Sequence, residues 1–209
     1  MLLCMWCCNS RNVKGDGHGD GLLGDEEEAA ARVMWHRIGD AFGEDEGVFF
    51  EAYNEPFGYK NARAYVDAMR RITQDLPQDR VVVDGLGYAG DVQSIKDLWP
   101  GLLGYHVYPW WLPAHARTQE RYSRLVQREL RGLGGRVFVT EFGANVTQKG
   151  LDYGDEGCIS DNVKFLRGVR DGFAAVKPRA TFVWHGWNNR DCYCFWAATK
   201  SARLSLIHI

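Results

Sequence analysis

Two glutamates, Glu55 and Glu141, follow short β-rich runs. The end of a strand is a place from which a side chain can contact a substrate. Glu55 comes just after the run at residues 48–53 and precedes Pro56, which cannot extend strand hydrogen bonding. Glu141 closes a similar run that begins at Val137. Hydrolysis of a glycosidic bond needs two flanking carboxyl groups, one protonated to assist the leaving oxygen and one ionised to attack. We therefore interpret Glu55 and Glu141 as a candidate catalytic pair.

The elements that must position this pair alternate between strands and helices. This alternation is typical of βα units around a parallel sheet, and it predicts that both glutamates lie at carboxyl ends of strands, the face on which barrel enzymes carry their chemistry. Residues 1–7 would add one more strand at the amino end. The predicted strands are residues 48–53, 81–84, 102–107, 137–140 and 181–184, and the predicted helices lie near residues 25–42, 60–74, 91–98, 118–131 and 160–176.

The fold class that we predict is α/β, a TIM (β/α)8 barrel that is incomplete, with about six of eight strands present. We expect one partial barrel domain over residues 1–209. A full barrel takes about 250 residues, so the sequence is short by roughly two βα units at its amino end, and we expect a gene fragment. Residues 202–209 are either a short natural tail or a non-native one, because residues 204–209 resemble a translated sequencing adapter.

Four motifs in one order carry a family resemblance. The segments at residues 54–56 (Asn-Glu-Pro) and 140–143 (Thr-Glu-Phe-Gly) resemble the cellulase-like glycoside hydrolases of family 5, within the retaining barrel clan. Between them, His106 and Tyr108 match the His-x-Tyr that this family carries on its sixth strand. The resemblance covers about residues 25–196. The tryptophan that follows the family's eighth strand is matched by Trp184 or Trp187.

The resemblance implies double displacement with retention of configuration. Glu55 would be the general acid/base, and Glu141 would be the nucleophile that forms a covalent glycosyl-enzyme. It implies no cofactor and no metal. Other roles fall to substrate-binding residues: Asn54 would hydrogen-bond the sugar 2-hydroxyl, Tyr108 would hold Glu141, His106 would line the adjacent subsite, and Trp184 or Trp187 would form the sugar platform. Trp110 and Trp111 are either outer-subsite residues or loop packing.

Two other functions stay open. One is a non-catalytic carbohydrate-binding barrel or an inactive fragment, because the arginine and histidine of the family's early strands have no match in residues 1–8. The second is a metal-dependent hydrolase using His18 and the cysteines, which would lose function with a chelator. The cysteines are Cys4, Cys7, Cys8, Cys158, Cys192 and Cys194.

Composition narrows the partner to an uncharged molecule. The net charge is −2 and the pI about 6.3, so no basic field exists to hold nucleic acid or an anionic membrane surface. No stretch reaches the roughly 18 apolar residues needed to span a bilayer, and residues 1–8 lack a signal-peptide pattern. The resemblance implies extracellular action on a β-linked plant-type polysaccharide or oligosaccharide, endoglucanase- or mannanase-like. The fold leaves the glycan undecided.

Overall fold

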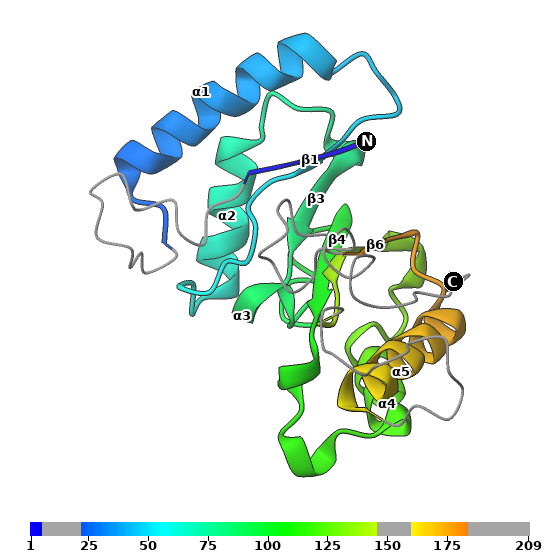
Figure 1. Cartoon of the computed structure of the whole chain (residues 1–209). Coiled ribbons are helices and arrows are strands. Elements are labelled where there is room, and N and C mark those ends of the chain that lie inside the picture. The colour runs from blue at the N-terminus through cyan, green and yellow to red at the C-terminus, as the bar shows by residue number, and fades with distance from the viewer. Residues whose placement is uncertain (6–21, 146–159, 184–209) are drawn as a thin grey trace. The chain divides into compact units, whose positions relative to one another are not determined.

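A computed structural model describes residues 1–5, 22–145 and 160–183 of the chain (Figure 1). Within these residues six strands form one sheet in sequence order, interleaved with helices. This confirms the predicted α/β fold with six strands of an incomplete barrel. The strands are β1 (Leu2–Cys4), β2 (Phe49–Glu51), β3 (Val81–Asp84), β4 (Leu102–Val107), β5 (Val137–Phe142) and β6 (Ala180–Val183). The helices are α1 (Asp25–Phe42), α2 (Ala62–Ile72), α3 (Leu86–Ala89), α4 (Gln119–Glu129) and α5 (Asp161–Val176).

The strands β1 to β4 pair in parallel. Phe49 lies opposite Leu2, Val82 opposite Glu51, and Leu103 opposite Val83. Every residue of β3 and β4 is buried, as expected for parallel strands covered on both faces. Because all four strands run in one direction, their carboxyl ends, and the residues that follow them, lie at one edge of the sheet.

The chain divides into two compact units. The first comprises residues 1–106 and 136–138, and the second comprises residues 107–135 and 139–209. In the first unit α1 packs on α2, and Trp35 Nε1 of α1 donates to the Ala52 carbonyl at 3.2 Å. Burial of that indole fixes the helix against the segment that leads from β2 to Glu55.

In the second unit α4 and α5 pack side by side (Figure 1). Two glycines of α5 allow the close approach. A Cβ at Gly168 would lie 2.4 Å from the Gln119 carbonyl oxygen, and one at Gly172 would lie 2.7 Å from Val126 Cβ. Any larger residue at either position would push the helices apart. Among the helices that the structure describes, none is both long and apolar enough to cross a bilayer.

The helix predicted at residues 91–98 is wrong. The short helix α3 precedes this segment, and a bridge between Leu86 and Asp91 uses the backbone of Asp91. The following residues form a series of turns, with Lys96 N donating to Val92 O at 3.1 Å. Pro100 disfavours helical geometry in Trp99, the residue before it. Between the bridge at Asp91 and Trp99 the segment is too short for a regular helix.

Candidate active site

Glu55 lies four residues beyond the end of β2 in a strained backbone conformation. Its φ is 52°, in the left-handed region, which costs a residue with a side chain about 1–2 kcal/mol. Two backbone hydrogen bonds hold it there. Glu55 N donates to Asp84 Oδ2 at 3.1 Å, and Phe57 N donates to Glu55 O at 2.7 Å. Strain of this kind, held by its surroundings, is typical of functional positions.

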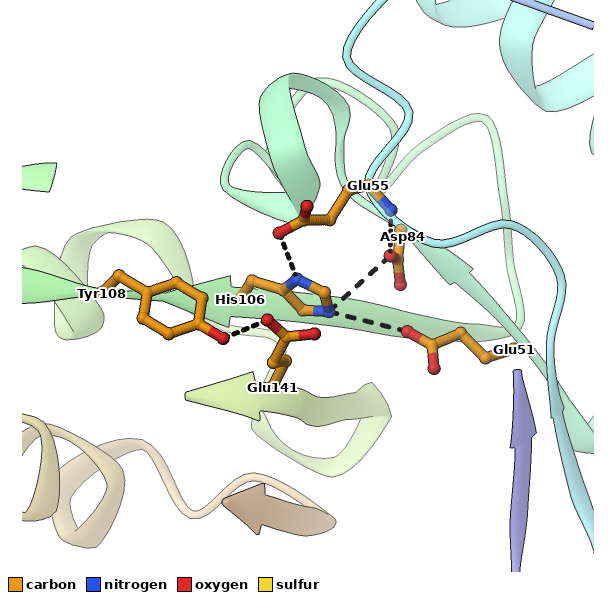
Figure 2. Close-up of polar contacts among 6 residues, drawn as sticks. All are labelled: Glu51, Glu55, Asp84, His106, Tyr108 and Glu141. Carbon is orange, nitrogen blue, oxygen red and sulfur yellow. Dashed lines mark hydrogen bonds and ion pairs between the residues drawn. The ribbon is translucent and has the colours of Figure 1, made fainter. Parts of the chain in front are cut away.

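The Glu55 side chain meets the imidazole of His106 from β4. The distance from Glu55 Oε1 to His106 Nδ1 is 3.0 Å (Figure 2). His106 is 0% exposed. The imidazole is therefore a partner of Glu55, and a place for His106 beside a sugar subsite stays a prediction.

Two further carboxyl groups lie on the other side of the His106 ring (Figure 2). Nε2 is 3.6 Å from Glu51 Oε1 of β2 and 3.8 Å from Asp84 Oδ2 of β3. Glu51 is 3% exposed and Asp84 is 0% exposed. One oxygen or nitrogen atom from each of these three side chains lies within 4.8 Å of the other two, which is close enough for the carboxyl charges to interact strongly or for a cation to bind.

The two buried carboxyl groups have opposite pKa shifts. Burial, followed by the charge of Glu51, raises the pKa of Asp84 well above its ordinary value. Burial also acts to raise the pKa of Glu51. The hydrogen bond and charge of His106, with hydrogen bonds from Asp84 and Cys4, outweigh that effect and lower the pKa of Glu51 overall. Asp84 therefore keeps its proton to higher pH than Glu51 does.

In the second unit, Glu141 lies in regular strand backbone near the end of β5. The hydroxyl of Tyr108 donates to Glu141 Oε1 (Figure 2). The Tyr108 ring is stacked on Trp110, with centroids 4.5 Å apart and planes 8° from parallel. Trp110 is 56% exposed, so its indole offers a flat apolar surface to solvent beside the buried tyrosine.

The turn that carries Trp110 is anchored by Tyr122 of α4. The Tyr122 hydroxyl donates to the Pro109 carbonyl at 2.6 Å, and its ring meets Phe165 of α5 edge to face. Burial raises the pKa of Tyr122 to about 12, so the phenol stays protonated and keeps this hydrogen bond. The Tyr108–Trp110 stack is thereby fixed to the helix pair.

Of the other predicted site residues, Asn54 and Trp111 lie in the part of the chain that the structure describes. Asn54 is buried, and its backbone N donates to Met5 O at 3.0 Å. Trp111 lies in the short 3-10 helix Pro109–Trp111. The remaining predicted residues lie outside the described part of the chain: Trp184, Trp187, His18, Cys7, Cys8, Cys158, Cys192 and Cys194.

Sequence reasoning missed the roles of Glu51 and Asp84. A signal for Asp84 was present, because it closes a run of three valines and precedes a glycine, as Glu141 closes its own β-rich run. The signal for Glu51 was weaker. An acidic residue in a short hydrophobic strand can face either side, and the sequence does not say which.

Comparison with known proteins identifies the family of this chain. The family model described as cellulase (glycosyl hydrolase family 5) matches residues 14–192. XacCel5A, solved in complex with cellopentaose, is 16% identical with a TM-score of 0.58, over 90% of this chain and 64% of its own. The catalytic domain of endoglucanase Cel5A from Thermobifida fusca is 15% identical with a TM-score of 0.58, over 91% of this chain and 62% of its own.

A beta-glucanase from Saccharophagus degradans is 18% identical with a TM-score of 0.57, over 75% of this chain and 51% of its own. The chain thus spans less than two thirds of the length of each of these structures. No curated protein matches the sequence. Such low identities establish the fold alone, whereas the family model covers most of the chain. This chain belongs to glycosyl hydrolase family 5.

Proposed function

We propose that this chain carries the catalytic residues of a retaining glycoside hydrolase that cleaves β-linked glucan chains. Glu55 is the general acid/base and Glu141 is the nucleophile. The observation that carries this assignment is the difference between their partners. Glu55 contacts a histidine backed by buried carboxyl groups, and Glu141 accepts a hydrogen bond from a tyrosine hydroxyl.

The surroundings of Glu55 suit an acid. The Glu55 carboxyl contacts His106, and buried Glu51 lies on the other side of the same imidazole, so the histidine can orient the carboxyl toward a leaving oxygen. In the first step Glu55 gives its proton to the leaving oxygen. In the second step it takes a proton from the water that hydrolyses the intermediate. The strained backbone at Glu55 fixes the carboxyl for both steps.

The surroundings of Glu141 suit a nucleophile. A hydroxyl donor stabilises the ionised carboxylate and orients the attacking oxygen. The carboxylate attacks the anomeric carbon as the bond to the leaving oxygen breaks, and its charge is lost to the glycosyl ester. Asn54, next to Glu55 in sequence, would hydrogen-bond the sugar 2-hydroxyl, and Trp184 or Trp187 would stack on the sugar ring.

Two observations support a glucan as substrate. The similar structures include an endoglucanase, a beta-glucanase and a complex with cellopentaose. The exposed Trp110 indole offers a flat face of the kind that sugar rings stack on. We assign it to an outer subsite.

Hydrolysis of an aryl cellobioside tests the proposal. The purified chain should release the aryl group, and Glu141→Ala should abolish release. Glu120→Gln, an exposed helix residue of the same unit, is the matched control and should retain full activity. Cellopentaose that binds without turnover in the wild-type chain would instead indicate a carbohydrate-binding protein, and loss of turnover with a chelator would indicate a metal-dependent enzyme.

A crystal structure gives a second test. Retention requires the two carboxyl groups to flank one bond at about 5–5.5 Å, whereas inversion needs about 6.5–9.5 Å to admit a water. We expect the shorter separation between Glu55 and Glu141. A separation in the longer range would overturn the assignment of Glu141 as nucleophile.

A further inference from the structure

A pair of buried carboxyl groups lies on the side of the His106 ring opposite the Glu55 carboxyl. Glu51 and Asp84 come from neighbouring strands and are almost fully buried. In the described part of the chain, neither has a lysine or arginine partner. Cys4 of β1 contributes a hydrogen bond to Glu51. Two carboxylates so close and so dry cannot both be ionised, because desolvation and mutual repulsion act together.

The packing around Asp84 is shaped to hold it. A Cβ at Gly104 of β4 would lie 1.9 Å from Asp84 Oδ1, so only a glycine leaves room for this carboxyl group. Asp84 Oδ2 accepts the hydrogen bond from Glu55 N. The other oxygen is therefore the one available to carry a proton.

His106 connects the pair to Glu55. Its Nε2 faces Glu51 Oε1 at 3.6 Å, and its Nδ1 faces Glu55 Oε1 at 3.0 Å. One negative charge on the Nε2 side favours a proton on that nitrogen. Nδ1 is then left unprotonated and can accept a hydrogen bond from the protonated carboxyl of Glu55, as a carboxylic partner fixes the tautomer of a functional histidine.

We propose that Glu51 and Asp84 share a single proton, carried by Asp84, and that the one remaining negative charge positions His106 as the Nε2–H tautomer behind Glu55. Glu51 and Asp84 are thus positioning residues that act through His106. The groups that face them are Cys4 from β1, His106 from β4 and Glu55 after β2. The effect on catalysis rests on the proposed function of Glu55, but the shared proton does not.

Infrared spectroscopy tests the proton without any need for hydrolysis. The wild-type chain at neutral pH should show a carboxylic acid band that disappears in Asp84→Asn. Asp79→Asn, an exposed residue, is the control and should leave the band unchanged. If the spectra of the wild type and Asp84→Asn show no difference in this band, the shared proton is overturned. A stoichiometric metal ion in the purified chain would overturn it as well.

The pH profile of kcat/KM tests the link to Glu55. Asp84→Asn mimics the protonated acid and keeps the charge of Glu51, so its alkaline midpoint should stay near that of the wild type. The double variant Glu51→Gln/Asp84→Asn removes the charge, and its alkaline midpoint should fall by roughly one pH unit. Equal midpoints in the wild type and the double variant would overturn the positioning role. Absence of turnover in the wild-type chain would count against the proposed function and leave the infrared result to decide the shared proton.

Discussion

The two candidate catalytic glutamates lie in very different local environments. Glu55 follows a strand in left-handed backbone, and the network beside it holds one histidine and two more acids. Glu141 lies in regular strand backbone, and a tyrosine stacked on an exposed tryptophan donates to it. A histidine can orient a carboxyl group that gives up a proton, and a hydroxyl donor can orient a carboxylate that attacks. The comparison teaches that environment, rather than residue type, divides the two roles.

The largest expected loss of activity follows replacement of either glutamate, and the two variants should differ in how that loss depends on the substrate's leaving group. Glu141→Ala should lose roughly 10⁴-fold or more in kcat/KM on every substrate, because no covalent intermediate forms. Glu55→Ala should lose about 10²–10⁴-fold on cellopentaose but much less on a dinitrophenyl cellobioside, whose leaving group needs no proton. Steady-state kinetics on both substrates provide the measurement. A leaving-group dependence in Glu141→Ala instead would reverse the assignment.

The next effect concerns the hydroxyl that holds Glu141. Tyr108→Phe removes one hydrogen bond to a carboxylate and should lower kcat about 10- to 100-fold. Tyr88→Phe is the control, because that ring is half-exposed and stacks only on Phe57 among its described ring contacts. Similar kinetics in Tyr108→Phe and Tyr88→Phe would show that the tyrosine hydroxyl does not support the nucleophile.

The close packing of Gly104 against the Asp84 carboxyl predicts an effect on the free energy of unfolding. Gly104→Ala forces the Asp84 carboxyl out of its position and should lower the free energy of unfolding by about 1–3 kcal/mol. Gly135→Ala, where a Cβ would meet nothing within 4 Å, should change it by less than about 0.5 kcal/mol. Urea unfolding of both variants provides the comparison. An unaffected Gly104→Ala would mean that the cluster tolerates displacement of Asp84.

The raised pKa of Asp84 predicts how stability depends on pH. The folded chain keeps this proton above the ordinary pKa of an aspartate, whereas the unfolded chain releases it. Wild-type stability is therefore reduced as pH rises through that window. Asp84→Asn lacks this loss, so its stability relative to the wild type should improve from about pH 4 to pH 7. A relative stability that falls over this range would contradict the shift.

The smallest effect concerns backbone strain at two left-handed residues. Glu55 and Lys177, the residue that ends α5, have φ values of 52° and 57°. Replacement by glycine relieves the strain, so each variant should gain about 0.5–1 kcal/mol over the corresponding alanine variant in thermal unfolding. Activity should be lost only at Glu55. Equal unfolding temperatures for the glycine and alanine variants at a position would show that its left-handed backbone stores no strain.

The sequence predicted the strands well, because periodic signals there are strong. Runs of β-branched and aromatic residues predicted β3 and β4 with their observed bounds, and Pro56 indicated that Glu55 follows a strand. The strand predicted at residues 137–140 extends further, so Glu141 lies within β5. The helix prediction at residues 91–98 failed because helix-forming residues are present there, but the backbone of Asp91 is used in a local bridge to Leu86.

The interior of the site was harder to predict than its motifs. A sequence identifies Glu55 by its neighbours Asn54 and Pro56, but it does not reveal that Glu51 and Asp84 face the same imidazole. That contact depends on the register between β2, β3 and β4. The left-handed backbone at Glu55 was likewise invisible, because glycine, its usual marker, is absent there.

Trapping the covalent intermediate tests the central claim most directly. A fluorinated cellobioside that forms the glycosyl ester faster than water cleaves it would be incubated with the chain, and the labelled peptide identified by mass spectrometry. We expect one cellobiosyl-type adduct on Glu141 and none on Glu55. An adduct on Glu55, or turnover of the activated sugar with no adduct on either glutamate, would contradict it.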